Sequence, residues 1–402
     1  MSLLYFLSNN VNNDGVSNPP ETDVPAGSAS VSIQSDISLI PNNPAQTERW
    51  YGRPVLKDIG DDIWCMVYAN SEAHNVLTSS QLHVRFSDDY GETWSDENKY
   101  IDGSSVTGFP MYPPGAVPGE TDEGPGEPWL YVCPNGDLLV HMWKVQYATT
   151  KNGSYQSRST DGGKTWSTPA LIDFTGTTRD LYIYSTDDDF VLGNTIYAGA
   201  REYLNIVQTD GIKSIFIKSD DNGVTWDYVS DITDFSTRPT NEVGLEYIGN
   251  NKIVAICRGT NSVADGGPYK VSYLVTSDDL GVTWNTPTTP ANIQVNGRIR
   301  IKSRSHVKGK NNWWFDPVLI AHGFDQQDIP NGSQRRICVY ISKDFGDTWS
   351  TAKYLRITGY DGGYGDFLYN PNTDEYVSLQ YYAPTSLLDG EIRQINWKLN
   401  WI

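Results

Sequence analysis

Apolar residues are gathered in short runs that alternate with polar turns along most of the chain. Residues 81–86 read QLHVRF, 273–276 read YLVT and 338–341 read CVYI, and each run leads directly into a segment rich in Asp and Gly. Further apolar runs separated by Gly and Asn lie within 193–203 and 244–259. Short runs bounded by Gly, Asn and Asp are typical of β-strands joined by hairpins. The pattern therefore predicts an all-β protein.

One eight-residue motif, S-x-D-x-G-x-T-W, occurs five times without exception. The copies begin at Ser87, Ser159, Ser219, Ser277 and Ser342, which are 72, 60, 58 and 65 residues apart. Asp can hydrogen-bond the local backbone and Gly accepts a positive φ, so the motif predicts a hairpin turn that the Trp covers. We interpret all five copies as scaffold and not as chemistry.

The spacing of the motif predicts the architecture. A period of about 60 residues fits a four-stranded blade, and a ring of such blades is a β-propeller. Five copies and a final segment without one, 364–402, predict six blades, the last of which closes with an N-terminal strand. Because residues 8–48 are rich in Asn, Ser, Pro and Gly, we divide the chain into an arm or linker over 1–48 and a propeller over 49–402.

Composition narrows the choice of partners. The 402 residues include 13 Trp, 25 Tyr and 36 Gly, as expected for strands and tight turns, and carry a formal net charge of −19. Such a charge repels nucleic acid and anionic membranes. No apolar run approaches the roughly 18 residues of a membrane-spanning helix, and the first residues do not form a good signal peptide. We expect no nucleic acid partner and no membrane insertion.

The four cysteines do not point to a metal or a disulfide framework. Cys65, Cys133, Cys257 and Cys338 each lie in an apolar run of a different repeat. We predict buried free thiols, since pairing would have to join distant strands. No Cys or His spacing suggests a metal, and no motif calls for a cofactor.

The repeated motif resembles the Asp box of the sialidase (neuraminidase) superfamily, and the resemblance extends from about Arg49 to the C-terminus. It implies a six-bladed, sialidase-like β-propeller with Asp-box hairpins. It also implies a glycosidase that acts on a glycan or polysaccharide, at an extracellular, periplasmic, cell-surface or virion-surface location. Oligomeric state does not follow from the sequence.

The sialidase resemblance also implies site residues. Arg53, Arg258 and Arg335 match the three arginines that hold the sugar carboxylate, as guanidinium forks can. Tyr364 matches the nucleophile and Glu242, 16 residues before Arg258, the base that activates it. These residues imply retaining removal of a terminal acidic, sialic-acid-like sugar. Arg336 neighbours Arg335, but strand alternation turns only one of them inward, and we choose Arg335.

The general acid departs from the family pattern. Sialidases place an Asp between the first arginine and the first Asp box, where this chain has Glu72 and His74 but no Asp. We take Glu72 and Glu127 as candidates for the acid and His74 as a further site residue.

A second resemblance, to exo-arabinanases, fits a different set of residues. Glu127 lies in GEPWLYVCPNGDLLV, Arg179 in TTRDLYIY and Glu202 in IYAGAREY, and the two glutamates are 75 residues apart, about one blade. This resemblance implies two carboxylates on a neutral sugar, with retention if they lie about 5–5.5 Å apart and inversion if they lie further apart. The same scaffold also suits a polysaccharide lyase that uses Tyr and His, or a carbohydrate-binding propeller without catalytic activity.

Overall fold

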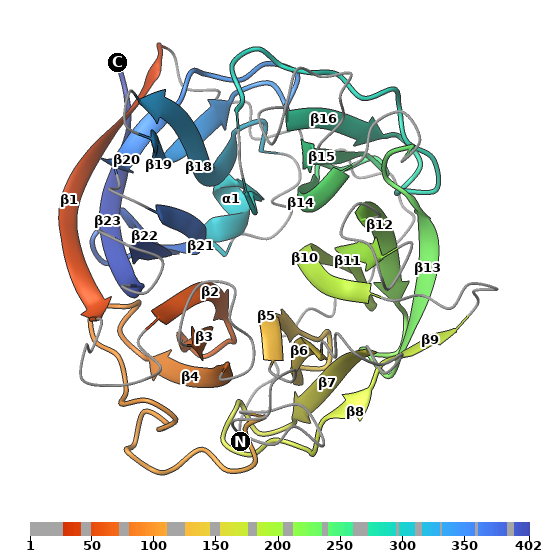
Figure 1. Cartoon of the computed structure of the whole chain (residues 1–402), viewed down its shortest axis with the longest axis vertical. Helices are drawn as coiled ribbons and strands as arrows, with labels where there is room; N and C mark the ends of the chain where they lie inside the picture. The colour runs from red at the N-terminus through yellow and green to blue at the C-terminus, as the bar shows by residue number, and fades with distance from the viewer. Residues whose placement is uncertain are drawn as a thin grey trace, which may run out of the picture.

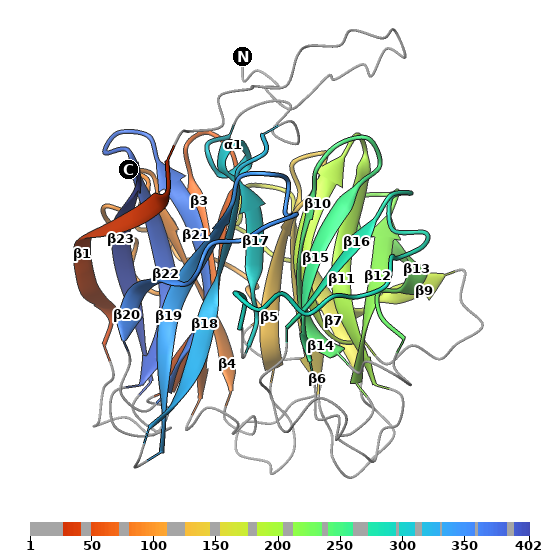
Figure 2. The ribbon, with the colours of Figure 1, turned by 90° about the horizontal axis from the view of Figure 1, so that it is seen from above.

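The computed structural model of the chain describes residues 27–41, 50–71, 80–110, 125–144, 153–175, 183–203, 212–234, 240–259, 272–294, 297–309, 316–329, 332–357, 361–383 and 390–402. These residues form six β-sheets arranged as a ring (Figure 1). Seen from the side, the sheets form one layer of upright strands (Figure 2). The fold is the predicted six-bladed β-propeller.

The first five blades are each built from strands that follow one another in the sequence, and blade 6 also takes in β1. Blade 1 contains β2 (Trp50–Asp58), β3 (Trp64–Ser71) and β4 (Gln81–Ser87). Blade 2 contains β5 (Pro125–Val132), β6 (Leu138–Lys144), β7 (Gly153–Ser159) and β8 (Ala170–Leu171). Blade 3 contains, in spatial order, β10 (Ile183–Leu192), β11 (Thr195–Tyr203), β12 (Ile212–Ser219), β13 (Thr225–Asp231) and β9 (Asp173–Thr175).

The second half of the ring follows the same plan. Blade 4 contains β14 (Thr240–Tyr247), β15 (Ile253–Gly259) and β16 (Ser272–Ser277). Blade 5 contains β17 (Arg300–Ser303), β18 (Leu319–Ile329), β19 (Gly332–Ser342) and β20 (Lys353–Ile357), with the short helix α1 (Arg304–Val307) after β17. Blade 6 contains β21 (Asp361–Asn370), β22 (Glu375–Ala383), β23 (Glu391–Trp401) and β1 (Ala29–Ile40). The strands β2, β5, β10, β14 and β21 surround the axis (Figure 1), and β17 lies in the middle of the side view (Figure 2).

The ring closes between its two ends. β1 runs antiparallel to β23 from the Ala29–Trp401 pair to the Ile40–Ile392 pair, and it lies on the outside of blade 6 (Figure 1). The expectation that an N-terminal strand closes the ring is therefore confirmed. It also corrects the predicted boundary at 48/49, because residues 29–40 of the expected arm are a strand of the propeller. Most residues of β1 are half-buried or exposed, as suits the outermost strand of a sheet.

Every copy of the repeated motif forms the same hydrogen-bonded turn. In the first copy, Thr93 donates to Asp89 from its backbone N (2.8 Å) and its Oγ1 (2.6 Å), while the backbone N of Gly91 donates to Ser87 Oγ (2.8 Å). Tyr90 and Gly91 have φ of 57° and 84°, so both lie in the left-handed region. The other four copies repeat these bonds. The motif is scaffold, as the sequence predicted.

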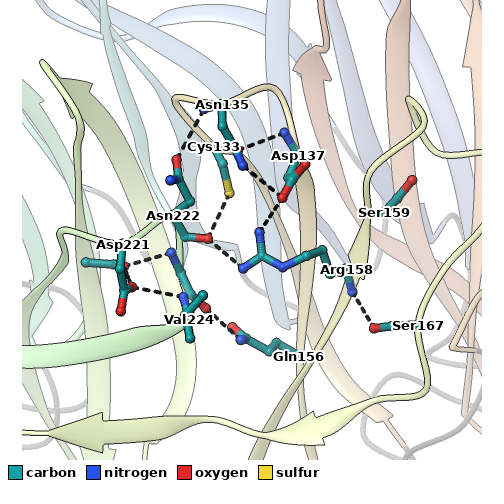
Figure 3. Close-up of polar contacts among 12 residues, drawn as sticks. Cys133, Asn135, Asp137, Gln156, Arg158, Ser159, Ser167, Asp221, Asn222 and Val224 are labelled. Atoms are coloured by element: carbon teal, nitrogen blue, oxygen red, sulfur yellow. Dashed lines mark hydrogen bonds and ion pairs between the residues drawn. The ribbon is translucent and has the colours of Figure 1, made fainter.

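The motif turns also join neighbouring blades. Figure 3 shows the joint between blades 2 and 3, where Arg158 donates to the carbonyl of Asn222 (2.6 Å) and pairs with Asp137 (2.7 Å). Gln156 donates to the carbonyl of Gly223 at 2.6 Å, so the motif of blade 3 is held on blade 2 by side chains of β7. Such joints fix the relative position of the inner strands.

The interior is apolar between the blades. Cys65, Cys133, Cys257 and Cys338 are buried free thiols, which confirms their interpretation as core residues. No helix among the described residues is long and apolar enough to span a bilayer.

Candidate functional site

Five inner strands, β2, β5, β10, β14 and β21, carry a register shift close to their N-terminal ends, and in four of them the shift falls at a residue selected from the sequence. Register shifts in β2, β5, β14 and β21 fall at Arg53, Glu127, Glu242 and Tyr364. A bulge interrupts ladder pairing and re-aims a side chain, and bulges are common beside active sites. Four residues selected from the sequence thus lie at the irregular points of the inner ring.

The bulges have visible causes. Pro54 and Pro128 follow Arg53 and Glu127, and proline cannot donate to a ladder. Arg53 and Tyr364 have φ of 56° and 41°, a left-handed conformation that costs a residue with a side chain on the order of 1–3 kcal/mol. The fold holds both residues in this conformation, which brings their side chains to the axis.

Glu127 lies at the centre of an arginine cluster. Its carboxylate is 3.8 Å from Arg53 Nε and 2.9 Å from Arg298 Nη2, and it accepts a hydrogen bond from Arg201 Nη2. The residue is 5% exposed. Burial alone would raise the pKa of Glu127, but the guanidiniums of Arg201, Arg53 and Arg298 hold this pKa far below its usual value. Glu127 is therefore ionised, and its negative charge is paired with the three guanidiniums.

Glu242 is joined to the same cluster. Its Oε2 accepts a hydrogen bond from Arg258 Nη1 at 2.5 Å, and its Oε1 lies 3.9 Å from Arg201 Nη1. Burial opposes ionisation, but Arg258 and Arg201 lower the pKa of Glu242. Arg201 thus links two buried carboxylates, those of Glu127 and Glu242, through its two terminal nitrogens.

Tyr364 completes the cluster on the side of Arg258. Burial, and then the negative charge of Glu242, raises the pKa of the Tyr364 phenol to about 12 in spite of Arg258. The phenol also hydrogen-bonds Arg258. The Arg258 side chain is 15% exposed, the most of the four arginines, so solvent reaches the cluster here. A phenol beside a carboxylate and a guanidinium can act as a nucleophile if the carboxylate takes its proton.

The cluster has an excess of positive charge among the described residues. Four guanidiniums face two carboxylates, which leaves two positive charges at pH 7 with the tyrosine neutral. Buried charge of one sign attracts the opposite sign strongly, because the surroundings screen it little. The cluster therefore favours an anionic ligand.

Arg335 is separated from the cluster by the aromatic side chain of Phe324. Its guanidinium stacks over Phe324 at 5.0 Å, and the Phe324 ring is 5.8 Å from the Tyr364 ring. Arg336 instead binds both carboxylate oxygens of Asp325 (2.8 and 2.7 Å). The two adjacent arginines are therefore directed differently, and Arg335 is the one on the side of Tyr364.

Glu202 does not join Glu127, contrary to the expected carboxylate pair. Its carboxylate is 2.9 Å from Lys213 Nζ on the neighbouring strand. Successive residues of a strand point to opposite faces, so Arg201 is the β11 residue that reaches Glu127. Three further expected site residues, Glu72, His74 and Arg179, lie outside the described residues.

Arg201 and Arg298 were missed at the sequence level. Arg298 belongs to the segment R-I-R-I-K at 298–302, whose alternating charges could have marked it. Arg201 directly precedes the chosen Glu202, so a one-residue change of register would have identified it.

A second layer of buried charge lies further along the same inner strands. Lys57 contacts Asp189 at 2.5 Å, and Lys302 contacts Asp366 at 2.8 Å. The Arg300 guanidinium stacks on Trp129 at 4.0 Å. These contacts join blade 1 to blade 3, and blade 5 to blades 6 and 2, beside the cluster. Among the described residues, no group of three His, Cys, Asp or Glu side chains could hold a metal ion.

Comparison with known proteins agrees with this fold. The profile of the BNR repeat-like domain family matches residues 115–376, so the chain belongs to that family. The Hadza microbial sialidase Hz136 is similar over 91% of this chain and 68% of its own, at 16% identity and a TM-score of 0.66. The α-L-arabinofuranosidase Arb93A from Fusarium graminearum is similar over 90% and 97%, at 14% identity and a TM-score of 0.60.

A protein of unknown function from Dyadobacter fermentans has a TM-score of 0.68 at 16% identity, over 92% of this chain and all of its own. No curated protein sequence matches significantly. The chain therefore shares the propeller fold of sialidases and arabinofuranosidases, as the sequence predicted.

Proposed function

We propose that the protein is a retaining glycosidase that removes a terminal acidic sugar from a glycan. The observation that carries the proposal is the buried cluster, in which a tyrosine–glutamate pair adjoins four arginines with two excess positive charges. The family relationship supports a glycosidase, and a glycan substrate implies an extracellular, periplasmic, cell-surface or virion-surface location.

In the proposed reaction, the Tyr364 oxygen attacks the anomeric carbon while Glu242 takes the phenolic proton. The bond to the leaving oxygen breaks, and a general acid protonates that oxygen. Water then hydrolyses the tyrosyl–sugar bond with the proton movements reversed, so the anomeric configuration is retained. No cofactor is needed. Arg258, the most exposed arginine of the cluster, is best placed to meet the sugar carboxylate, with Arg53 and Arg335 assisting.

The general acid is assigned by elimination between two candidates. Glu127 is a poor acid because three guanidiniums keep it ionised. Glu72 therefore remains the proposed acid, with His74 beside it in the sequence.

The test is hydrolysis of a panel of aryl glycosides that includes a sialoside, a uronide and an arabinofuranoside. The wild type should release the aryl group from an acidic glycoside, and Tyr364→Phe should lose at least about 100-fold in rate, since the nucleophile is gone. Tyr369→Phe on the same strand is the matched control, because Tyr369 bonds Asp374 outside the cluster. Equal rates in Tyr364→Phe and wild type would contradict the mechanism, and no turnover of any substrate would favour a lyase or a binding propeller.

A neutral-sugar glycosidase is the second candidate, because Glu127 and Glu242 share Arg201 and so lie in one cluster. It would use these two carboxylates in place of the expected Glu127 and Glu202. Release of an arabinofuranoside that Tyr364→Phe retains and Glu242→Gln loses would select it. The depressed pKa of both glutamates argues against it, since one must be protonated to act as the acid.

A further inference from the structure

Glu127 has the surroundings of a counter-ion. Its carboxylate belongs to blade 2, and it contacts Arg53 of blade 1, Arg201 of blade 3 and Arg298, which lies two residues before β17 of blade 5. All four side chains are at most 6% exposed. One carboxylate thus gathers three guanidiniums from other parts of the ring at a place that water hardly reaches.

Three guanidiniums would not stay together without this carboxylate. Like charges in a poorly screened interior repel one another, and a carboxylate offers about four lone-pair sites to bind them. The position of Arg201 matters most among the three, because its second terminal nitrogen also lies 3.9 Å from Glu242. The position of Glu127 therefore affects Glu242, the proposed partner of Tyr364.

We propose that Glu127 is a positioning residue, which gathers Arg53, Arg201 and Arg298 into one anion-binding group and transfers no proton. Arg201 and Arg298 thereby become part of the binding machinery, beyond the three arginines expected from the sequence. A small free carboxylate of the size of formate fits the same role. The positioning role follows from the contacts alone, and only its effect on turnover rests on the proposed glycosidase function.

The first test removes the carboxylate and supplies it from solution. Glu127→Ala leaves a space of carboxylate size between three guanidiniums, so its melting temperature should fall and then rise with sodium formate in a saturable way. Sodium chloride at equal ionic strength should restore clearly less. The melting temperature of the wild type should not respond to formate beyond the salt effect. A response of Glu127→Ala that is the same in formate and chloride would overturn the proposal.

Asp325→Ala is the matched control. Asp325 is also 5% exposed and also binds an arginine through both oxygens, but Arg336 is its single described arginine partner and is 19% exposed. This variant should lose stability without a saturable formate response. A formate rescue equal to that of Glu127→Ala would mean that any lost ion pair behaves in this way and would count against a special arginine group.

Two further variants keep the test decisive if Glu127→Ala does not fold. Glu127→Asp keeps the charge with a shorter side chain, and Glu127→Gln keeps the shape without the charge. A counter-ion role predicts a higher melting temperature for Glu127→Asp than for Glu127→Gln at pH 7. The opposite order would show that shape matters more than charge and would refute the role.

Kinetics separate positioning from proton transfer. Glu127→Gln should raise KM for an acidic aryl glycoside about tenfold or more, because the guanidiniums lose the carboxylate that holds them in place, with the shape of the pH–rate profile unchanged. A fall in kcat at constant KM, with loss of one limb of the profile, would make Glu127 a proton donor instead. If the wild type turns over no substrate, the glycosidase proposal fails, while the formate result still decides the role of Glu127.

Discussion

Replacing Gly281 by alanine tests how the motif glycines join adjacent blades. Gly281 has φ of 81°, and a Cβ built there would lie 2.2 and 2.3 Å from two carbons of the Phe216 ring. Phe216 is fully buried and is held between Trp284 (5.6 Å between ring centroids) and Tyr197 (5.8 Å). The ring therefore has little freedom to move away. Gly136 is the matched control, since its φ is 87° and nothing lies within 4 Å of its added Cβ.

The two variants share one cost and differ in another. An alanine in the left-handed region costs about 1–2 kcal/mol, which is the expected loss for Gly136→Ala. Gly281→Ala adds overpacking of about 1–3 kcal/mol against Phe216. Urea unfolding followed by tryptophan fluorescence would measure both losses from the midpoints, provided the slopes agree with wild type. An equal loss in the two variants would show that the blades separate enough to admit a methyl group, and would refute the reasoning.

Two remaining predictions concern buried charges. Burial raises the pKa of Asp188 from 3.8 to about 7 in the folded protein. The unfolded chain loses this proton at a lower pH than the folded protein does, so the folded state loses stability as the pH rises from about 4 to 7. The free energy of unfolding of Asp188→Asn relative to that of wild type, measured by urea unfolding, should rise by up to ~4 kcal/mol over this window. A difference that stays constant with pH would contradict the prediction. Arg298→Leu should raise KM for acidic glycosides about tenfold and leave binding of neutral sugars unchanged, as measured by steady-state kinetics and calorimetry.

The fold could be predicted because its signal is local. Ser, Asp, Gly and Thr of each motif bond within one turn, so five short segments were enough to define the repeat. Arg53 and Glu127 were selected from the two family resemblances, which also rest on short local segments. The closing strand was expected, but its range was not. Ala29, Val31, Ile33, Ile37 and Leu39 alternate with polar residues as in a strand, but this alternation lies within a longer stretch, 8–48, whose Asn, Ser, Pro and Gly favour an arm.

The other two arginines of the cluster, Arg201 and Arg298, were harder to find because their role depends on register. Arg201 and Glu202 are adjacent, and the choice between them is a choice of which strand face meets the axis. Arg298 alternates with isoleucine, a pattern that normally places the charge in solvent. In a ring, however, one face of an inner strand meets the axis, where charges from other blades compensate it. That compensation is a property of the assembled ring and is not visible in one segment.

The overall charge and the local charge of the protein have opposite signs, and distance decides which one a ligand meets. The net charge of −19 acts on an approaching anion from a surface where salt screens it within roughly 8–10 Å. The guanidiniums of the cluster are buried, so their attraction is screened far less once a small anion is in contact. A long polyanion such as nucleic acid remains exposed to the repulsive surface over most of its length. A single acidic sugar at the end of a glycan chain would meet mainly the arginines, which is why the acidic surface is compatible with the proposed acidic substrate.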